Sequence, residues 1–583
     1  MRRFLLLSLT ATVGLVAQAA ASTPQWTTYR HDAARSGIDP DSTNPVTPSQ
    51  AWQTPALDGE VYGQPLVYGS YVYVATENDS IYALGAATGA VVWSMQLATP
   101  EASSMAPCGD ISPSIGITST PVIDPAMNRI YAAGATSDGV HSSSVQHKLF
   151  ALDLGSGQEV AGFPITIDPP FPSGGAPRNQ LQRAGLALDQ GRILIGYGGN
   201  DGDCNTYWGW LVSAPESGTG ALSSFQADPH FTKGAVWGSG NAPTIDASGN
   251  VFIATGNGTS GASSNPDFGD AVVKLGSSAS ALDWWAPPNW QSLDSSDADL
   301  GSSMPTLLPG GYLFESGKDG NGYVLNGANL GNVSAAPFSA SCGSGSFGGS
   351  VYDAANATIY ATCGGLKALS LTFGSPPSFT AKAGFSAPSG AKGPPMIAGG
   401  LVWATNYSSG TLYGLDPSSG AARAQFSIPE DGSDVNHFAS PSAGGGRLFV
   451  GSGDRVTAYT IAQAPPQSPT ATAPALSGLR VSPHRLPVGR HHRFKAKVRY
   501  TLSIAARVTL TIKRQVKDRK GRRHWVRVHG RLTLTGKAGA NTFTFHGWIG
   551  GRRLGRGAYE LIATPRGGGT TGAARVARFM VVG

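Results

Sequence analysis

The chain has 583 residues, of which 40% are hydrophobic and 13% charged, with 79 glycines and 40 prolines. This composition excludes an intrinsically disordered protein, and the length exceeds that of one ordinary domain. The charge is unevenly distributed: residues 475–583 contain 24 lysines and arginines but two acidic residues, whereas the remainder contains 18 and 34. We therefore expect two domains with different surfaces.

The amino terminus has the pattern of a targeting segment. Arg2 and Arg3 precede an apolar run at 4–16, and small residues follow at 17–22. This pattern predicts a secretory signal peptide over residues 1–21. The apolar run is too short for a permanent membrane span, and no later segment has the length of a transmembrane helix. We expect an exported protein, secreted or associated with the cell envelope.

Residues 63–97 form one unit of an internal repeat. Four short apolar or alternating runs, separated by Gly-containing turns, predict four antiparallel strands. Such a unit is typical of a β-propeller blade, which needs neighbouring blades to bury both of its faces. Similar units begin at residues 63, 119, 183, 241, 303, 348, 393 and 439.

The last unit ends near residue 461 without a fourth strand, while the segment 51–57 precedes the first unit. Pairing of these two segments would close the ring and remove its open edges. The sequence thus predicts an all-β fold. An eight-bladed β-propeller of four-stranded antiparallel blades covers residues 22–461, and its N-terminal strand closes the ring.

Long insertions separate the first five units. They lie at residues 101–117, 137–147, 168–181 and 258–269. Loops of this length on one side of a propeller are typical of a binding face for a protein or small-molecule ligand. The alternative is that they have no function beyond connecting strands.

The even number of cysteines predicts disulfides in an exported protein. Cys342 and Cys363 flank an apparent hairpin, so they are placed to bridge neighbouring strand ends. Cys108 and Cys204 would then pair by elimination. A metal site is the competing interpretation, although the spacings match no zinc pattern.

A linker rich in Pro, Ala, Ser and Thr covers residues 462–478, and alternating apolar and basic residues fill 479–583. The period of two predicts a small antiparallel β-sandwich, similar to the Ig-like or fibronectin-like modules of secreted proteins. Its charge favours binding to an anionic cell-wall polymer or surface, with nucleic acid an unlikely partner. The alternative is a soluble spacer.

The first domain resembles the PQQ-like repeat propellers of the quinoprotein alcohol dehydrogenase-like superfamily. The run "ALGAATGAVVW" (83–93) matches their blade motif with Gly85 in place of Asp, and further copies occur at 151–160 and 414–422. The opening "WTTYRHDAARSG" (26–37) also resembles the start of such proteins. The resemblance covers roughly residues 25–461. It implies the fold but not the activity, because the family includes both dehydrogenases and non-enzymatic propellers that bind or assemble proteins.

The resemblance also implies candidate site residues for the cofactor PQQ and a Ca²⁺ ion. Asn257 occupies the place of an Asn metal ligand, and Asp201 lies near that of a glutamate ligand. Asp299 stands at the offset of the catalytic base, where it would also contact the metal. Lys318 matches the cationic position beside the quinone, and Trp237 resembles the Trp on which the quinone ring rests.

The sequence departs from the family pattern at several of these places. Ala298 replaces the usual Trp before the base, and Trp237 lies three residues further from Asp246 than the pattern expects. Asp201 is one carbon shorter than the glutamate ligand. The disulfide between adjacent cysteines found in many of these enzymes is absent, as is a CxxCH haem motif.

Each candidate also has a purely structural interpretation. Asn257 lies between glycines and would suit a turn that needs positive φ. Lys318 belongs to a Lys-Asp-Gly run that is common in hairpins, and Trp237 would suit packing between blades. Asp294 and Asp297 compete with Asp299 for the place that faces the ring's axis.

Two functions remain open from the sequence. The leading hypothesis is an exported propeller that acts as a ligand-binding, protein-binding or scaffold module, tethered to an anionic surface by its basic second domain. The alternative is a PQQ- and Ca²⁺-dependent quinoprotein dehydrogenase that oxidises an alcohol or polyol. The dehydrogenase hypothesis requires Asn257, Asp299, Lys318 and Asp201 to converge.

Overall fold

The computed structural model describes residues 23–259, 267–428, 438–463, 474–487, 495–518, 520–567 and 570–582. The signal peptide predicted for residues 1–21 lies outside the described residues, as does most of the predicted linker. The chain divides into two compact units, one spanning Ser22–Pro465 and the other containing Pro466–Gly583.

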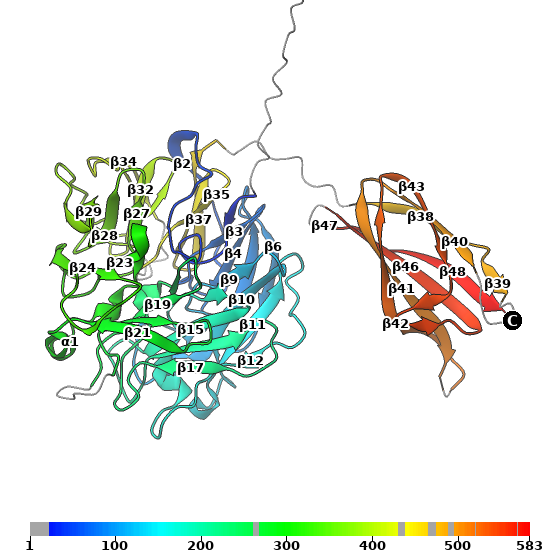
Figure 1. The fold of residues 1–583 in the computed structure, drawn as a ribbon, viewed down its shortest axis with the longest axis horizontal. Coiled ribbons are helices and arrows are strands. Elements are labelled where there is room, and N and C mark those ends of the chain that lie inside the picture. Colours follow the sequence, from blue (N-terminus) through cyan, green and yellow to red (C-terminus); the bar gives the residue numbers. More distant parts are fainter. Residues whose placement is uncertain are drawn as a thin grey trace, which may run out of the picture. The chain divides into compact units, whose positions relative to one another are not determined.

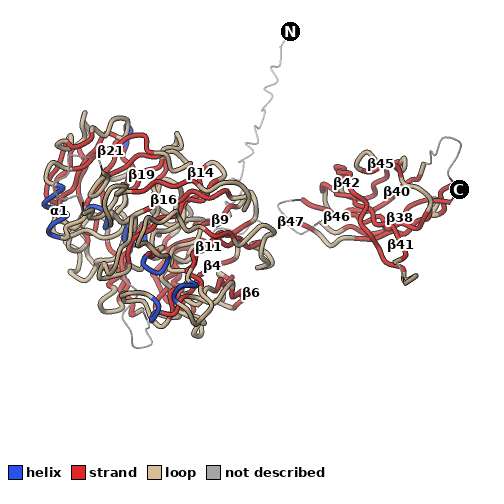
Figure 2. Tube along the Cα trace, turned by 90° about the horizontal axis from the view of Figure 1, so that it is seen from below, coloured by secondary structure: helices blue, strands red, loops and turns tan. Residues whose placement is uncertain are grey.

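Strands make up nearly all of the regular structure, and the helices are short (Figure 2). Within the described residues, α1 (Trp290–Ser296) is the one α-helix, and six 3₁₀ turns occur. None of the described helices has the length and apolar character needed to cross a membrane. The fold is therefore all-β, as the period-two patterns predicted.

The described part of the first unit contains eight sheets of four or five strands, and the sheets follow one another in chain order (Figure 1). Sheet 1 comprises β1 (Gln25–Trp26), β3 (Leu66–Tyr68), β4 (Tyr71–Thr76), β5 (Ser80–Gly85) and β6 (Val91–Gln96). Sheet 2 comprises β9 (Val122–Asp124), β10 (Arg129–Thr136), β11 (Gln146–Asp153) and β12 (Ile165–Thr166). Sheet 3 comprises β13 (Gln180–Leu181), β14 (Ala187–Asp189), β15 (Arg192–Gly199), β16 (Trp210–Pro215) and β17 (Ser223–Gln226). Sheet 4 comprises β18 (Thr244–Ile245), β19 (Val251–Ala254), β20 (Val272–Leu275), β21 (Ala281–Ala286) and β25 (Asn332–Val333).

The remaining four sheets have four strands each. Sheet 5 comprises β22 (Thr306–Leu308), β23 (Tyr312–Ser316), β24 (Asn321–Asn326) and β26 (Phe338–Ser341). Sheet 6 comprises β27 (Val351–Asp353), β28 (Thr358–Thr362), β29 (Leu366–Thr372) and β30 (Ser378–Ala381). Sheet 7 comprises β31 (Met396–Ala398), β32 (Leu401–Asn406), β33 (Thr411–Leu415) and β34 (Ala422–Ser427). Sheet 8 comprises β35 (Ser442–Gly444), β36 (Arg447–Ser452), β37 (Arg455–Ala462) and β2 (Pro45–Gln53).

Sheet 8 joins the two ends of the first unit, because the early strand β2 pairs antiparallel with the late strand β37 (Figure 1). The fourth strand predicted at residues 51–57 is displaced, since β2 ends at Gln53. Pro55 has no backbone N–H and cannot continue the ladder. Two further hydrogen bonds nevertheless follow, from the N–H of Thr54 to Val456 O and from that of Leu57 to Asp454 O.

Tryptophan side chains pack across the interface between sheets 8 and 1 and across that between sheets 1 and 2. Trp93 of β6 lies against Gly157, in the turn after β11, and its indole N–H donates to Leu154 O at 3.1 Å. Trp52 of β2 lies in the same way against Gly89, in the turn after β5. A Cβ at either glycine would lie 2.6 Å from the indole ring, so only glycine fits. The strand β2 thus docks sheet 8 onto sheet 1 as β6 docks sheet 1 onto sheet 2.

Apolar clusters fill the space between consecutive sheets. One cluster contains residues of sheets 7, 8, 1 and 2 together, including Trp403, Phe449, Tyr73 and Ile130, all buried. The other clusters join sheets 2 and 3, 3 and 4, 4 and 5, 5 and 6, and 6 and 7. Every sheet therefore shares a core with the one before it and the one after it.

The segment 26–38 contacts sheets that are far apart in the sequence. The N–H groups of Ile123 (sheet 2), Ile245 (sheet 4) and Ile397 (sheet 7) donate to its carbonyl oxygens at 2.7, 2.8 and 2.8 Å. The guanidinium of Arg30, 1% exposed, donates to carbonyl oxygens of the residues just before β27 and β31. This segment links four sheets by hydrogen bonds.

The second unit contains two main sheets in its described residues. One comprises β38 (Leu476–Ser482), β40 (Ala496–Leu502) and β43 (Gly539–Phe545). The other has the order β39 (Arg485–Pro487), β48 (Arg575–Val582), β46 (Gly557–Gly567), β41 (Ala506–Lys517) and β42 (Arg523–Gly536), with β47 (Thr570–Thr571) beside β46. Alternate residues of both sheets form one buried core, which is the arrangement of a sandwich. The strands β37 and β38 extend into the two ends of the predicted linker.

Candidate functional site

The first unit contains a cavity of about 680 Å³. All five site residues predicted from the sequence line it: Asp201, Trp237, Asn257, Asp299 and Lys318. The convergence that the dehydrogenase hypothesis requires is thus present in the structure.

The repeat explains why three of these residues meet. Asp201, Asn257 and Lys318 each lie in the loop after the second strand of a repeat unit, namely β15, β19 and β23. Neighbouring sheets of a repeat present equivalent loops at the same end. Consecutive sheets 3, 4 and 5 therefore each contribute one polar side chain to the cavity.

Lys318 is the cation at the centre of this group. Its Nζ lies 3.0 Å from Asp299 Oδ2 and 3.0 Å from Asp297 Oδ1, and 5.7 Å from the centre of the Trp237 ring. Burial alone would lower the pKa of Lys318, but Asp299 and Asp297 raise it above its ordinary value. The ammonium group therefore stays charged and holds both carboxylates in place.

Asp299 is almost completely buried, with 6% of its surface exposed. Burial raises its pKa to about 6, against the opposing effect of Lys318 and with a further contribution from Asp297 and Asp203. Its Oδ1 is buried and has no hydrogen-bond partner. A carboxylate with a pKa near neutrality and one unused oxygen has the properties of a general base.

Asn257 is held by its amide nitrogen and leaves its oxygen unused. The Nδ2 donates to Asp297 Oδ1 at 2.8 Å, whereas Oδ1 is buried without a partner. Neither Asn257 nor the glycines on either side adopt positive φ. The interpretation of Asn257 as a residue chosen for a left-handed turn is therefore wrong.

The three aspartates between residues 294 and 299 differ in their contacts and in their exposure to solvent. Asp297 and Asp299 both line the cavity, whereas Asp294 Oδ1 accepts the backbone N–H of Gly258 at 2.8 Å. Asp294 thus fixes the loop that carries Asn257. The side chain of Asp297 is 73% exposed, so Asp299 is the only buried carboxylate of the three that lines the cavity.

Asp201 lies on the exposed part of the rim. Its neighbour Asp203 is held more firmly, since Asp203 accepts the Tyr207 hydroxyl at 2.7 Å and pairs with Lys233 Nζ at 3.0 Å. Both aspartates line the cavity. Asp201 is therefore the least constrained of the predicted metal ligands.

Two disulfides join Cys108 to Cys204 and Cys342 to Cys363, and no described cysteine is free. The predicted pairing is confirmed, so these cysteines do not bind a metal. Cys108–Cys204 connects two loops whose neighbouring residues, among them Asp110 and Asp201, line the cavity. The bridge joins the insertion 101–117 to the rim.

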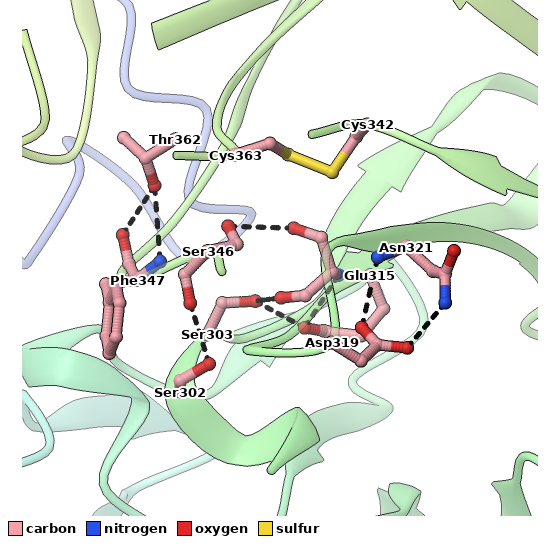
Figure 3. The surroundings of a disulfide bond; sticks show 11 residues. Ser302, Ser303, Glu315, Asp319, Asn321, Cys342, Ser346, Phe347, Thr362 and Cys363 are labelled. Atoms are coloured by element: carbon pink, nitrogen blue, oxygen red, sulfur yellow. Dashed lines mark hydrogen bonds between the residues drawn. A yellow bond between two sulfur atoms is a disulfide. The ribbon is translucent and has the colours of Figure 1, made fainter. Parts of the chain in front are cut away.

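The second disulfide fixes a loop that brings an aromatic ring to the cavity (Figure 3). Cys342 and Cys363 close this loop, and the Thr362 hydroxyl donates to Phe347 O at 2.7 Å. Ser302 donates its hydroxyl to Ser346 O at 2.7 Å. Phe347 is therefore presented on the cavity wall by a cross-linked loop.

Several cavity residues were missed from the sequence, among them Arg183, Phe347 and Phe438. Phe438 stacks on Phe347, with ring centres 5.3 Å apart, and contacts Trp237 edge to face. Nothing in the repeat pattern distinguishes these two phenylalanines. Arg183 could have been singled out from the sequence, because it occupies a repeat position where the other seven units have Gly, Ser, Asn or Ala.

The fit of the cavity to a hard cation and a planar cofactor depends on its oxygen atoms and its aromatic ring. The described residues contain no group of three His, Cys, Asp or Glu arranged to hold a metal ion by themselves. Two residues of the cavity wall nevertheless carry a buried oxygen without a partner, namely Asn257 Oδ1 and Asp299 Oδ1. Ca²⁺ takes six to eight oxygens, so these fit a cation that receives its other ligands from a bound molecule and water. Trp237 offers a flat ring for a planar group.

Comparison with known proteins places the fold. The protein-family model described as outer membrane protein assembly factor BamB matches residues 42–170. A quinohemoprotein alcohol dehydrogenase from Comamonas testosteroni is similar in structure, with a TM-score of 0.54, 15% identity, and coverage of 78% of this chain and 83% of that chain. A europium-containing methanol dehydrogenase is also similar, with a TM-score of 0.52 and 13% identity. The match covers 74% of this chain and 91% of that chain. BamB from Moraxella catarrhalis matches with a TM-score of 0.41 and 12% identity, over 71% of this chain and 99% of that chain. No curated protein matches the sequence.

The first unit thus has a β-propeller fold. The motif at residues 83–93, which predicted PQQ-like repeats, lies within the range that the family model matches. At these identities, the likeness to the solved structures concerns the fold alone.

Proposed function

We propose that the protein is a PQQ-dependent dehydrogenase that oxidises an alcohol or polyol in the cavity of its first unit. One observation carries this proposal. Asp299 and Asn257, both residues of the cavity wall, each carry a buried side-chain oxygen without a hydrogen-bond partner, and the same cavity is lined by Lys318 and Trp237. A buried polar atom without a partner costs about 1–3 kcal/mol, and a cation bound between these two residues would offset that cost.

The roles follow from the contacts. Asn257 Oδ1 and Asp201 would be ligands of a Ca²⁺ ion, with the Asp299 carboxylate beside them as the base, and Trp237 would support the flat face of the cofactor. Lys318, already paired with Asp299, would lie beside the cofactor's oxygens. PQQ, when bound, would accept a hydride from the alcohol carbon.

Asp299 would take the hydroxyl proton of the alcohol. Its Oδ2 is held by Lys318 at 3.0 Å, which leaves Oδ1 to accept the proton. Burial raises its pKa to about 6, so the group is ionised at neutral pH yet basic enough to accept a proton. Phe347 and Phe438 form an apolar wall that would exclude water from one side of the substrate.

The eight sheets of the first unit are, in this proposal, the blades of a closed ring. The pairing of β2 with β37, the matching positions of Trp52 and Trp93, and the shared core of sheets 7, 8, 1 and 2 support it. A closed ring would hold the loops of sheets 3, 4 and 5 at fixed distances, as a catalytic site requires.

The proposal includes export and a tether. The two disulfides are compatible with an oxidising compartment. The basic residues of 475–583 would bind an anionic polymer of the cell surface through charge. The second unit would then keep the dehydrogenase near the envelope.

The test is reconstitution of the full-length protein with PQQ and Ca²⁺. We expect PQQ to quench the tryptophan fluorescence of the protein in a saturable, Ca²⁺-dependent way, and a panel of alcohols to reduce an artificial dye. Absence of PQQ binding at millimolar Ca²⁺ would overturn the proposal and favour a binding or scaffold role. PQQ binding without reduction by any alcohol would reject the substrate class.

A further inference from the structure

The second unit presents a row of charged side chains on the larger of its two sheets. Lys513 of β41 lies directly opposite Arg527 of β42 and Glu560 of β46, and Glu560 lies opposite Arg578 of β48. Directly opposite residues of an antiparallel sheet point to the same side. Three cations and one carboxylate therefore line up across four neighbouring strands.

A second row runs beside the first on the same face. Gln515 lies opposite Trp525, Ala558 lies opposite Met580, and Arg485 of β39 is in parallel register with Met580. A shallow cavity of about 360 Å³ opens over this row. Its lining includes residues of all five of these strands together with Arg578.

Trp525 and Arg578 meet across this cavity. The Arg578 guanidinium lies 5.8 Å from the centre of the Trp525 ring, and its Nε donates to Glu560 Oε1 at 3.0 Å. The Arg578 side chain remains 75% exposed. Glu560 thus orients a cation beside an aromatic ring while leaving most of that cation accessible to solvent.

The floor of the cavity is rigid. The rings of Tyr559 and Phe579 stack with their centres 5.4 Å apart, and both residues are buried in the core of the unit. The Tyr559 hydroxyl donates to Gly555 O at 2.8 Å. The exposed row above therefore sits on a packed, hydrogen-bonded layer and loses little conformational freedom when a ligand binds.

The geometry points to a binding site for an acidic polysaccharide in which sugar rings carry carboxylates. The flat face of Trp525 would stack on the apolar face of a pyranose ring. Arg578 and Arg485 would bind carboxylates, which match the planar guanidinium group. Strands lie about 4.8 Å apart, so the cations of the first row have spacings of one or two strands and suit a polymer with repeated charges.

This inference makes the proposed tether specific and is independent of the proposed oxidation. A tether by charge alone would use all the basic residues of the unit equally. At a saccharide site, Trp525 and Arg578 would contribute most of the affinity for the polymer. The two cases are separated by variants that remove the same chemistry inside and outside the cavity.

The unit provides a matched control for each variant. Trp548 is 47% exposed and has the guanidinium of Arg553 4.6 Å from its ring, but it does not line the cavity. Arg531 is an exposed arginine of β42 that also lies outside the lining. The variants Trp525→Ala and Arg578→Gln are therefore compared with Trp548→Ala and Arg531→Gln.

The experiment measures binding of the full-length protein to polygalacturonate by titration calorimetry, with dextran as the neutral polymer. We expect Trp525→Ala to weaken binding about tenfold, and Trp548→Ala to change it less than twofold. Arg578→Gln should weaken binding several times more than Arg531→Gln. Dextran should not bind. Thermal unfolding of each variant checks that the second unit is folded.

Each contrary result has its own meaning. Absence of binding to polygalacturonate would overturn both the tether and the site. Equal losses in the cavity and control variants would leave the tether by charge but reject the site. Tighter binding to DNA or to anionic lipid vesicles than to polygalacturonate at the same ionic strength would reject the saccharide as the ligand. A Trp525→Ala protein that does not fold is replaced by Trp525→Leu, for which the same tenfold loss is expected.

Discussion

Lys318 and Asp299 form an ion pair of 3.0 Å that uses only one of the two carboxylate oxygens of Asp299. The other oxygen is buried without a partner in the wall of the same cavity. The buried oxygen without a partner distinguishes the Lys318–Asp299 ion pair from ion pairs at the surface of the protein, such as that of Arg423 with Asp416.

Asp299→Asn removes the proposed base while preserving the shape of the side chain. We expect the rate of dye-linked alcohol oxidation to fall about 10²- to 10⁴-fold, the usual contribution of a positioned acid or base. PQQ binding, followed by fluorescence, should persist. The control is Asp297→Asn, which also removes a partner of Lys318, but an exposed one, and which should lower the rate less than about tenfold. Equal losses in the two variants would exclude Asp299 as the specific base.

Asn257→Leu removes the unpaired oxygen proposed as a Ca²⁺ ligand. The Ca²⁺ concentration needed for half-maximal PQQ binding should rise at least about tenfold, a loss seen even for groups that only contact a metal ligand. Asn257→Asp keeps an oxygen at the same place and should need less Ca²⁺ than the leucine variant. An unchanged Ca²⁺ requirement in Asn257→Leu would remove Asn257 from the ligand set.

Glu315 gives the fold a pH dependence that does not involve the cavity. It is 1% exposed on β23, accepts the hydroxyl of Ser303 and the N–H of Ser316, and leaves Oε2 unpaired (Figure 3). Burial raises its pKa from 4.5 to about 8. Between these values the folded state binds a proton that the unfolded state lacks, so stability falls as the pH rises.

The variant Glu315→Gln removes this titration and keeps the size of the side chain. Relative to the variant, the wild-type protein should lose about 1.4 kcal/mol of unfolding free energy per pH unit between pH 5 and 8. Chemical denaturation of both proteins at several pH values measures the difference. A constant difference across this range would show that Glu315 is ionised in the folded state.

Arg30→Met tests the segment that links distant sheets. Arg30 donates hydrogen bonds to the carbonyl oxygens of Gly349, Ser350 and Pro395 at 3.2, 2.5 and 2.8 Å. Leaving buried acceptors unpaired should destabilise the first unit by about 3 kcal/mol or more. The matched change Arg423→Met, at an arginine whose side chain is 61% exposed, should cost less than about 1 kcal/mol. Similar losses from the two changes would contradict the linking role of Arg30.

The repeat made most of the first unit predictable. Each unit carries its own strand and turn signals, so the pattern of one unit supports the strand prediction for the others. The starts at residues 63 and 241, for example, follow from the same pattern. The bounds of β2 were harder to predict, because the strand Pro45–Gln53 pairs with residues about 400 positions away. Its register is set by that partner and not by its own period.

The candidate site was predictable only where it follows the repeat. Asn257 and Lys318 stand in equivalent loops, so the motif that resembles the dehydrogenases located them. Phe438 and Phe347 reach the cavity through loops, one of them fixed by the Cys342–Cys363 bridge, whose paths depend on tertiary contacts. The unpaired oxygen of Asp299 is a property of three-dimensional packing, which no local pattern records.

The segment 26–38 and the strand β2 have a consequence for how the first unit is made. Sheet 8 needs β2 from near the start of the unit and β37 from its end, and Arg30 needs carbonyl groups from residues 349–395. The strand β2 and the Arg30 side chain thus lack these partners until almost all of the unit has been synthesised. Assembly cannot finish sheet by sheet from the amino end, and an unfinished chain would expose the apolar faces with which sheet 1 and sheet 7 contact sheet 8.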